Sequence, residues 1–167
     1  MKKLIAYYSR ADENYFQGKL KYIKEGNTKK VALMIQKLVS ADLFEIRQKD
    51  GYASDYQTCI AQAKKDKENN ARPELVSLME SLDEYDEIYL GYPNYWGDMP
   101  MAIYTFLEAF DFKGKKIHPF CTHEGSGLSS TENKLKSILK EATIEKGIAI
   151  RGSDVNDALS ALEKWIG

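Results

Sequence analysis

Three short segments of the sequence concentrate glycine, small polar and aromatic residues, and each follows an apolar run. They are Ser9-Arg10 continuing to Gly26-Asn27-Thr28, Pro93-Asn94-Tyr95-Trp96-Gly97-Asp98, and Thr122-His123-Glu124-Gly125-Ser126-Gly127. Hydroxyl, amide and backbone N–H donors bind phosphate groups, and aromatic side chains stack on flat rings. In an open parallel α/β sheet the carboxyl ends of neighbouring strands meet at one crevice, so three such loops can form one ligand site.

The first segment has the residues of a phosphate site. Gly26-Asn27-Thr28 stands directly before a helical pattern, and a helix N-terminus offers free N–H groups and the positive end of the helix dipole. Ser9 adds a hydroxyl. Residues 11–25 intervene, and such an insertion can keep both its ends at the phosphate while its middle lies over the surface. Gly-Asn-Thr is also a common helix start, so a plain cap stays an alternative for this segment alone.

The second and third segments have the residues of a flat-ring site. Tyr95 and Trp96 follow a buried strand, where a planar ligand would explain half-exposed aromatic side chains, although both could instead pack in the core. Asp98 could simply cap the next helix. The glycines of 122–127 let backbone donors approach the edge of a heteroaromatic ring. Residues suited to a phosphate, to the face of a flat ring and to the edge of that ring thus meet in one crevice. Together they predict bound flavin mononucleotide (FMN).

His123 and Glu124 suggest two other kinds of chemistry, metal binding and acid–base catalysis. The chain has 2 histidines and no spaced cluster of histidine and carboxylate, so we expect no metal. Gly125-Ser126-Gly127 lacks the spacing of a nucleophile elbow, and neither Cys59 nor Cys121 has an activating neighbour in the sequence. No catalytic residue is assigned, because the redox chemistry would come from the cofactor. For His123 and Glu124, ring contacts and a solvated loop stay equal alternatives.

Short apolar runs alternate with helical patterns along the whole chain. Strands are expected at 4–8, 43–46, 88–92, 117–122 and 148–150. Helices are expected at 28–39, 56–70, 75–82, 101–110, 133–139 and 155–166. This alternation predicts an α/β fold, a doubly wound five-stranded parallel sheet with helices on both faces.

Composition narrows the class of protein. A chain of 167 residues fits one domain, 1–167, and a net charge of -1 offers no basic excess for nucleic acid and little field to steer an electron shuttle. No apolar run is long enough to span a bilayer or to act as a signal peptide. The 2 cysteines give no disulfide framework, so a cytoplasmic location is expected.

These segments resemble those of flavodoxin-like FMN-binding proteins, in particular a bacterial subgroup with a long insertion in the first (phosphate) loop. The resemblance covers nearly the whole chain. It is carried by these strings: Tyr8-Ser9-Arg10-Ala11, Glu13-Asn14-Tyr15, Gly26-Asn27-Thr28, Gly91-Tyr92-Pro93, Trp96-Gly97, 100–108, 119–128 and Ala149-Ile150-Arg151-Gly152. It implies the flavodoxin strand order 2-1-3-4-5, with FMN between the first and third strands.

The resemblance also implies roles for the three segments. Ser9, Arg10, Asn27 and Thr28 would contact the phosphate, residues 93–97 would flank the isoalloxazine ring, and residues 122–127 would bind its far edge. Tyr95 stands where many relatives of the subgroup carry a second tryptophan. The identity of the residue that stacks on the ring, Tyr95 or Trp96, therefore stays open.

The implied function is electron transfer or oxidoreductase activity, and three roles fit it. A flavodoxin proper would pass single electrons to a redox partner protein. An NAD(P)H-dependent quinone or flavin reductase would deliver two electrons to a small-molecule acceptor such as a quinone, and Tyr52, Tyr56 and Tyr95 could line a substrate shelf. A non-enzymatic FMN-binding sensor module is the third. The near-neutral charge weakens the shuttle hypothesis.

Overall fold

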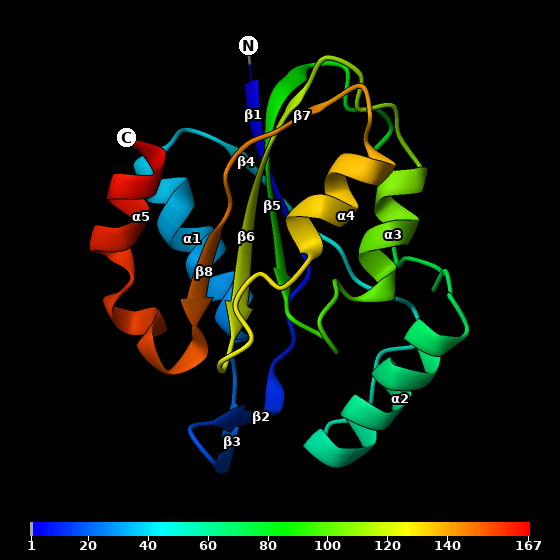
Figure 1. Ribbon diagram of the computed structural model, residues 1–167, viewed down its shortest axis with the longest axis vertical. Helices are drawn as coiled ribbons and strands as arrows, with labels where there is room; N and C mark the ends of the chain where they lie inside the picture. The colour runs from blue at the N-terminus through cyan, green and yellow to red at the C-terminus, as the bar shows by residue number, and fades with distance from the viewer. Residues whose placement is uncertain (1) are drawn as a thin grey trace.

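A twisted parallel sheet forms the centre of the computed structural model, which describes residues 2–167 (Figure 1). Its strands are β1 (Lys2–Tyr7), β4 (Asp42–Glu45), β5 (Tyr85–Pro93), β6 (Lys116–His123), β7 (Thr143–Ile144) and β8 (Ile148–Arg151). The order is β4-β1-β5-β6-β7, and β8 also pairs with β6. The predicted order 2-1-3-4-5 is confirmed, except that the fifth place is shared. β7 pairs with the start of β6 and β8 with its end.

Helices cover both faces of the sheet, as predicted. Helices α1 (Asn27–Leu38) and α5 (Leu159–Ile166) lie on one face, and α3 (Met101–Glu108) and α4 (Thr131–Ile138) on the other (Figure 1). A 3-10 turn, Gly152–Asp157, precedes α5. Successive strand residues point to opposite faces, so the strands supply two cores.

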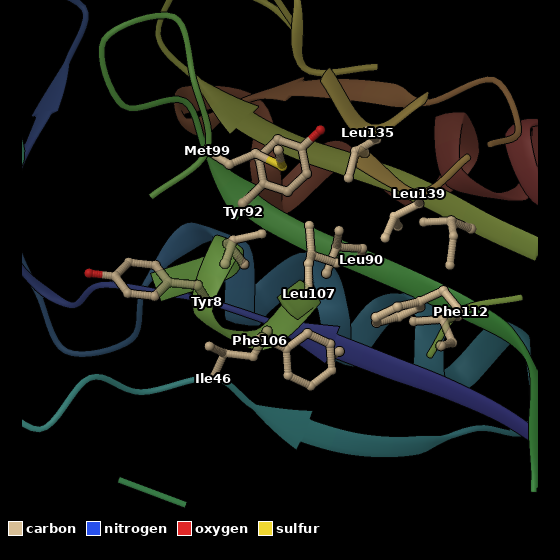
Figure 2. Close-up of a cluster of buried hydrophobic side chains, with 14 of the residues drawn as sticks. Tyr8, Ile46, Leu90, Tyr92, Met99, Phe106, Leu107, Phe112, Leu135 and Leu139 are labelled. Carbon is tan, nitrogen blue, oxygen red and sulfur yellow. The ribbon is translucent and has the colours of Figure 1, made fainter. Parts of the chain in front are cut away.

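Each core is a set of fully or nearly fully buried apolar side chains. Leu90, Tyr92, Phe106, Leu107 and Leu135 belong to the core under α3 and α4 (Figure 2). The core under α1 and α5 contains Ile5, Val31, Ile35, Phe120 and Leu162. The two cores fix the ends of the strands in space, and the three predicted segments begin at those ends.

Two elements lie at the carboxyl edge of the sheet, away from its faces. The insertion 11–25 forms an antiparallel hairpin, β2 (Asp12–Phe16) and β3 (Lys19–Ile23), and α2 (Tyr56–Glu68) also lies at this edge (Figure 1). Glu13 Oε1 accepts a hydrogen bond from the Tyr56 N–H at 2.9 Å. The Tyr15 and Tyr56 rings stack with their centroids 6.0 Å apart. The insertion is thus an ordered hairpin attached to the start of α2.

The helical turns expected over 75–82 are wrong, because this segment is irregular, with one isolated bridge between Leu75 and Gln48. The Val76 N–H donates to the Arg47 carbonyl at 2.7 Å, and the Lys49 N–H donates to the Glu74 carbonyl at 2.8 Å. Leu75 and Leu82 still reach the core under α3 and α4. Apolar residues at this spacing fit one helix face, but they fit equally an irregular segment anchored at both ends.

A side chain at position 91 would disturb the central strand pair. Gly91 lies beside Phe120, and a Cβ built on Gly91 would overlap the Phe120 ring. We expect Gly91→Ala to lower the free energy of unfolding by about 1–3 kcal/mol, the usual cost of overpacking a core. Urea denaturation followed by circular dichroism measures it. The cost should shrink when Phe120 is replaced by Leu, and an equal cost in both backgrounds would refute the clash.

Candidate functional site

A cavity of about 300 Å³ opens at the carboxyl edge of the sheet. All three predicted segments contribute to its walls, together with β2 and α2. The lining residues are Arg10, Asn14, Tyr15, Asn27, Thr28, Tyr56, Cys59, Ile60, Ala63, Pro93, Asn94, Tyr95, Trp96, Gly97, Thr122, His123, Glu124 and Ser126. Of the predicted site residues, Ser9, Gly26, Asp98, Gly125 and Gly127 do not line it.

The first segment closes tightly around the start of α1. Ser9 Oγ accepts a hydrogen bond from the Lys29 N–H at 3.0 Å and so caps the helix from the end of β1. A Cβ on Gly26 would overlap Ser9 Oγ and lie 2.7 Å from the Arg10 carbonyl oxygen. The N–H groups of Asn27 and Thr28 precede the first intrahelical bonds. This end of the cavity therefore offers backbone donors and the positive end of the α1 dipole.

Arg10 lines the cavity, but its guanidinium has partners of its own. It donates to the carbonyl groups of Glu13, Ala53 and Ser54, while its Nε is buried without a protein partner. These bonds tie β2 to the segment before α2. The phosphate contact that the resemblance implied for Arg10 stays a prediction, and its side chain also holds the hairpin in place.

The second segment is a two-residue turn between Tyr95 and Asp98. The backbone groups of Tyr95 and Asp98 exchange hydrogen bonds of 2.8 and 3.1 Å. Trp96 and Gly97 have φ angles of 57° and 75°, the combination of a type I′ turn. Asn94 stabilises the turn, because its Oδ1 accepts from the Gly97 N–H at 2.9 Å. A bulky residue in a left-handed conformation is uncommon and marks this turn as a constrained position.

Tyr95 and Trp96 have different surroundings. The Tyr95 ring packs edge-on against Tyr8 at 6.0 Å and near Tyr52 at 6.4 Å, and burial raises its pKa well above the ordinary value. Trp96 is 46% exposed. Its Nε1 donates to the Ile60 carbonyl at 2.9 Å, which fixes the indole on α2. Of Tyr95 and Trp96, Trp96 is therefore the one exposed enough to contact a ligand ring.

Two lysines of α2 contact Trp96, one at its backbone carbonyl and one at its indole ring. Lys67 Nζ donates to the Trp96 carbonyl, and Lys64 Nζ lies 5.2 Å from the centre of the indole ring. A cation over an aromatic face is attracted by the ring quadrupole. Helix α2 thus fixes the backbone and the side chain of Trp96 together.

Asp98 faces away from the cavity and serves the packing beneath it. Its carboxylate is buried and lies 2.7 Å from Lys134 Nζ of α4. It also accepts hydrogen bonds from the Tyr104 hydroxyl at 2.6 Å and from the Met99 N–H at 2.7 Å. Asp98 therefore connects the end of the turn to α3 and α4.

The third segment is folded by its own polar side chains. His123 Nδ1 accepts from the Gly125 N–H at 2.8 Å, so the neutral ring carries its proton on Nε2. Burial lowers the pKa of His123, and the Arg151 guanidinium lowers it further. Glu124 Oε1 accepts from the Ser153 N–H at 2.8 Å at the start of the 3-10 turn. Both side chains line the cavity and are ordered by these bonds.

The end of the first segment contacts the beginning of the third segment. Thr28 Oγ1 and Thr122 Oγ1 lie 2.7 Å apart and are buried. A Cβ on Gly152 would lie 2.5 Å from Asn27 Nδ2 and 2.8 Å from Glu124 Oε1. These contacts leave no spare space between the two loops, so their spacing is fixed by packing.

Sequence reasoning missed the cavity walls formed by the hairpin and by α2. Asn14 and Tyr15 come from the insertion, and Cys59, Ile60 and Ala63 from α2. The sequence predicted a helix over 56–70 but gave no sign of what its apolar residues would contact. Only the position of α2 beyond the sheet edge turns those residues toward a cavity.

Among residues 2–167 we find no group of three or more His, Cys, Asp or Glu that could hold a metal ion. Within the same residues, no helix is long and apolar enough to cross a membrane.

The walls of the cavity offer amide, hydroxyl and backbone groups next to an indole. These groups suit a ligand that combines an anionic end with a flat ring.

The family model for flavodoxin matches residues 18–167. The chain belongs to the flavodoxin family. Its expected α/β flavodoxin-like fold is confirmed by solved structures. A candidate flavoprotein of Bacteroides uniformis ATCC 8492 is 28% identical, with a TM-score of 0.78 over 99% of this chain and 97% of that one.

Two other solved structures resemble this flavodoxin-family protein over most of their length. A candidate flavoprotein of Bacteroides eggerthii DSM 20697 is 25% identical, with a TM-score of 0.74 over 96% of this chain and 97% of the other. The flavoprotein of Lactobacillus acidophilus NCFM in complex with FMN is 21% identical, with a TM-score of 0.67 over 95% and 98%. A search of curated proteins finds no match.

The placement of Asp98 gives a test of its structural role. Asp98→Ala removes the acceptor of Lys134, Tyr104 and the Met99 N–H, so we expect a loss of about 2–3 kcal/mol in the free energy of unfolding. Lys134→Met should cost less, because the Lys134 side chain is partly exposed. Urea denaturation measures both. A fully stable Asp98→Ala protein would rule out this role.

The pKa of His123 gives a second test, because it should lie below 6.5 in the folded protein. A histidine whose pKa falls on folding binds fewer protons when folded, so its contribution to stability is complete above pH 6.5 and is lost as the pH falls through the folded pKa. NMR titration of the imidazole protons measures this pKa, and His123→Gln identifies the signal. A pKa above 6.5 would show that His123 is not held in its neutral form.

Proposed function

We propose that this protein is an FMN-dependent redox protein that exchanges electrons at the carboxyl edge of its sheet. The observation that carries the proposal is the position of the cavity. It lies at the ends of β1 and β5, where the strand order reverses, and ligands of open α/β sheets bind at this point. FMN supplies the ability to accept and release electrons when it is bound.

The polar end of the cavity fits a phosphate. We assign the phosphate to the N–H groups of Asn27 and Thr28 at the start of α1, with the Thr28 hydroxyl and the Asn27 amide beside them. The missing Cβ of Gly26 supports this, because any side chain there would push Ser9 and Arg10 out of place. The assigned role of Ser9 is to keep the N-terminus of α1 in position.

The other end of the cavity fits a flat ring. We assign the ring face to Trp96, whose indole is held on α2, and to Pro93 beside it. The loop 122–127 would meet the far edge of the ring, where His123 offers an Nε2–H donor. Stacking on an indole contributes about 0.5–1.5 kcal/mol beyond the burial of area.

The family match and two solved structures with bound FMN support FMN as the cofactor. The Lactobacillus acidophilus structure and a flavodoxin of Fusobacterium nucleatum both contain flavin mononucleotide. Other structures of similar fold are an NADH:FMN oxidoreductase and an NADPH-quinone reductase of P. pentosaceus. At 14% and 12% identity they share only the fold, so electron transfer and NAD(P)H-dependent quinone or flavin reduction are both proposals here.

The three roles differ in how the flavin is reduced. Rapid reduction by NADH or NADPH in a stopped-flow experiment would favour a reductase, whereas reduction only through a partner protein would favour a carrier or a sensor module.

We further propose that residues 1–167 act as one domain in the cytoplasm. Cys59 and Cys121 are buried and unpaired, which fits a reducing compartment.

Tryptophan fluorescence tests the cofactor and its place. The chain has 2 tryptophans. Trp165 does not line the cavity, and its Nε1 donates to the Lys146 carbonyl at 2.8 Å. FMN added to the apoprotein should quench Trp96, so quenching should survive in Trp165→Phe and largely disappear in Trp96→Phe. Failure to retain FMN, or quenching that follows Trp165, would contradict the proposal.

A further inference from the structure

The β2–β3 hairpin is attached to both sides of the cavity. On the side of α2, Glu13 Oε1 accepts from the Tyr56 N–H at 2.9 Å, and the Glu13 N–H donates to the Ser54 carbonyl at 3.1 Å. On the other side, Gln17 Nε2 donates to Ser153 Oγ at 3.2 Å, in the 3-10 turn before α5. Figure 1 shows the hairpin beyond the ends of the strands, between α2 and that turn.

The part of the hairpin between these two attachments borders the cavity. Asn14 and Tyr15, which stand between the two attachment points in the chain, both line it. Four residues of extended strand span roughly 13 Å. Ser153 belongs to the opposite wall, because its N–H donates to Glu124 Oε1 at 2.8 Å and Glu124 lines the cavity. The hairpin therefore reaches from one wall of the cavity to the other.

The two attachments differ in strength. Beside α2, Arg10 adds hydrogen bonds to two backbone carbonyls, and the Tyr15 ring stacks on Tyr56. At the tip the attachment is a single exposed hydrogen bond to Ser153. β2 and β3 form a two-stranded sheet of their own, and a lone two-stranded hairpin is marginally stable. The tip can therefore leave Ser153 while the base stays attached beside α2.

The residue type at position 17 indicates a role for its side chain. Gln17 and Gly18 have φ angles of 47° and 87° and form the two-residue turn between Phe16 and Lys19. Such a turn favours Asn, Asp or Gly at its first position, because these residues enter the left-handed region most readily. Glutamine has no such advantage, but its longer side chain reaches Ser153. The bond to Ser153 thus explains a residue that the turn does not.

We propose that the hairpin, residues 12–23, is a strap across the FMN site and that the Gln17–Ser153 hydrogen bond is its latch. FMN enters and leaves while the latch is open, and the closed strap retains it. A latch that is the same with and without FMN stabilises the closed form of both states. Its loss therefore speeds entry and release by the same factor and leaves the affinity unchanged. This inference rests on the proposed function, because it takes FMN as the ligand.

Stopped-flow fluorescence measures both rate constants. Quenching of Trp96 follows the entry of FMN into the apoprotein. Release is followed by the recovery of Trp96 fluorescence when the FMN-loaded protein is mixed with an excess of Trp96→Phe apoprotein, which captures the FMN. Gln17→Met keeps the length of the side chain and removes the amide. We expect it to raise both rate constants by about 2- to 10-fold, the range for the loss of one hydrogen bond, with Kd within about twofold.

Two further variants test whether the effect comes from the latch. Ser153→Ala removes the partner hydroxyl and keeps the backbone N–H that binds Glu124. It should act like Gln17→Met, and the double variant should add nothing, because one hydrogen bond is lost only once. Tyr22→Ser is the matched control, since Tyr22 is on the same hairpin, is 66% exposed and does not line the cavity. It should leave both rate constants within about twofold of the unchanged protein.

Three results would overturn the proposal. Unchanged rate constants in Gln17→Met and Ser153→Ala would show that the bond latches nothing. Additive effects, or equal effects of Tyr22→Ser, would show that the two side chains do not act as one latch. Faster release with weaker affinity and unchanged entry would show that Gln17 holds FMN itself and not the hairpin.

Hydrogen exchange of the apoprotein gives a second measurement, which does not need FMN. Gln17→Met should speed exchange of the backbone amides of β2 and β3 severalfold and leave those of α1 unchanged, because only the hairpin is released. Equal protection of the hairpin in both proteins would contradict the latch. Failure of the unchanged protein to retain FMN counts against the proposed function instead, and hydrogen exchange then still decides whether Gln17 holds the hairpin closed.

Discussion

The close crossing of the chain at Arg10 and Gly26 is the constraint on which the whole site depends. The chain leaves the end of β1 at Arg10, makes the hairpin, and returns at Gly26 so close to Ser9 and Arg10 that no Cβ fits. Ser9 then caps α1 through the Lys29 N–H. Because the excursion is closed at its base, α1 begins beside the end of β1. The free-energy cost of closing a loop rises only slowly with its length.

The insertion adds to the walls of the crevice. Arg10 and Glu13 bind the hairpin to the segment before α2, and α2 in turn holds Trp96 through Ile60 and Lys67. The turn that would face the flavin ring is therefore supported by elements that lie outside the sheet. The same connected set supplies the walls of the cavity that come from the hairpin and from α2.

The alternation of strands and helices was predictable because it follows from short-range patterns, whereas the strand order was implied by the family resemblance. Apolar runs mark buried strands, and alternation with helical patterns leaves few topologies. The partners of Arg10 and Asp98 were not predictable, because they depend on carbonyl groups and a lysine brought near by tertiary packing. The helical spacing over 56–70 predicted α2, but not that Cys59, Ile60 and Ala63 would line the cavity. The segment 75–82 was misassigned since leucine spacing alone does not separate a helix from an irregular segment whose two ends are anchored in the core.

A crystal structure of the protein with FMN tests the central claim most directly. The account predicts the phosphate at the N–H groups of Asn27 and Thr28, the ring against Trp96 and its far edge at the loop 122–127, with the Arg10 guanidinium still bonded to the carbonyl groups of Ala53 and Ser54. FMN bound elsewhere, or a phosphate held by Arg10 after the hairpin has moved away from α2, would contradict it.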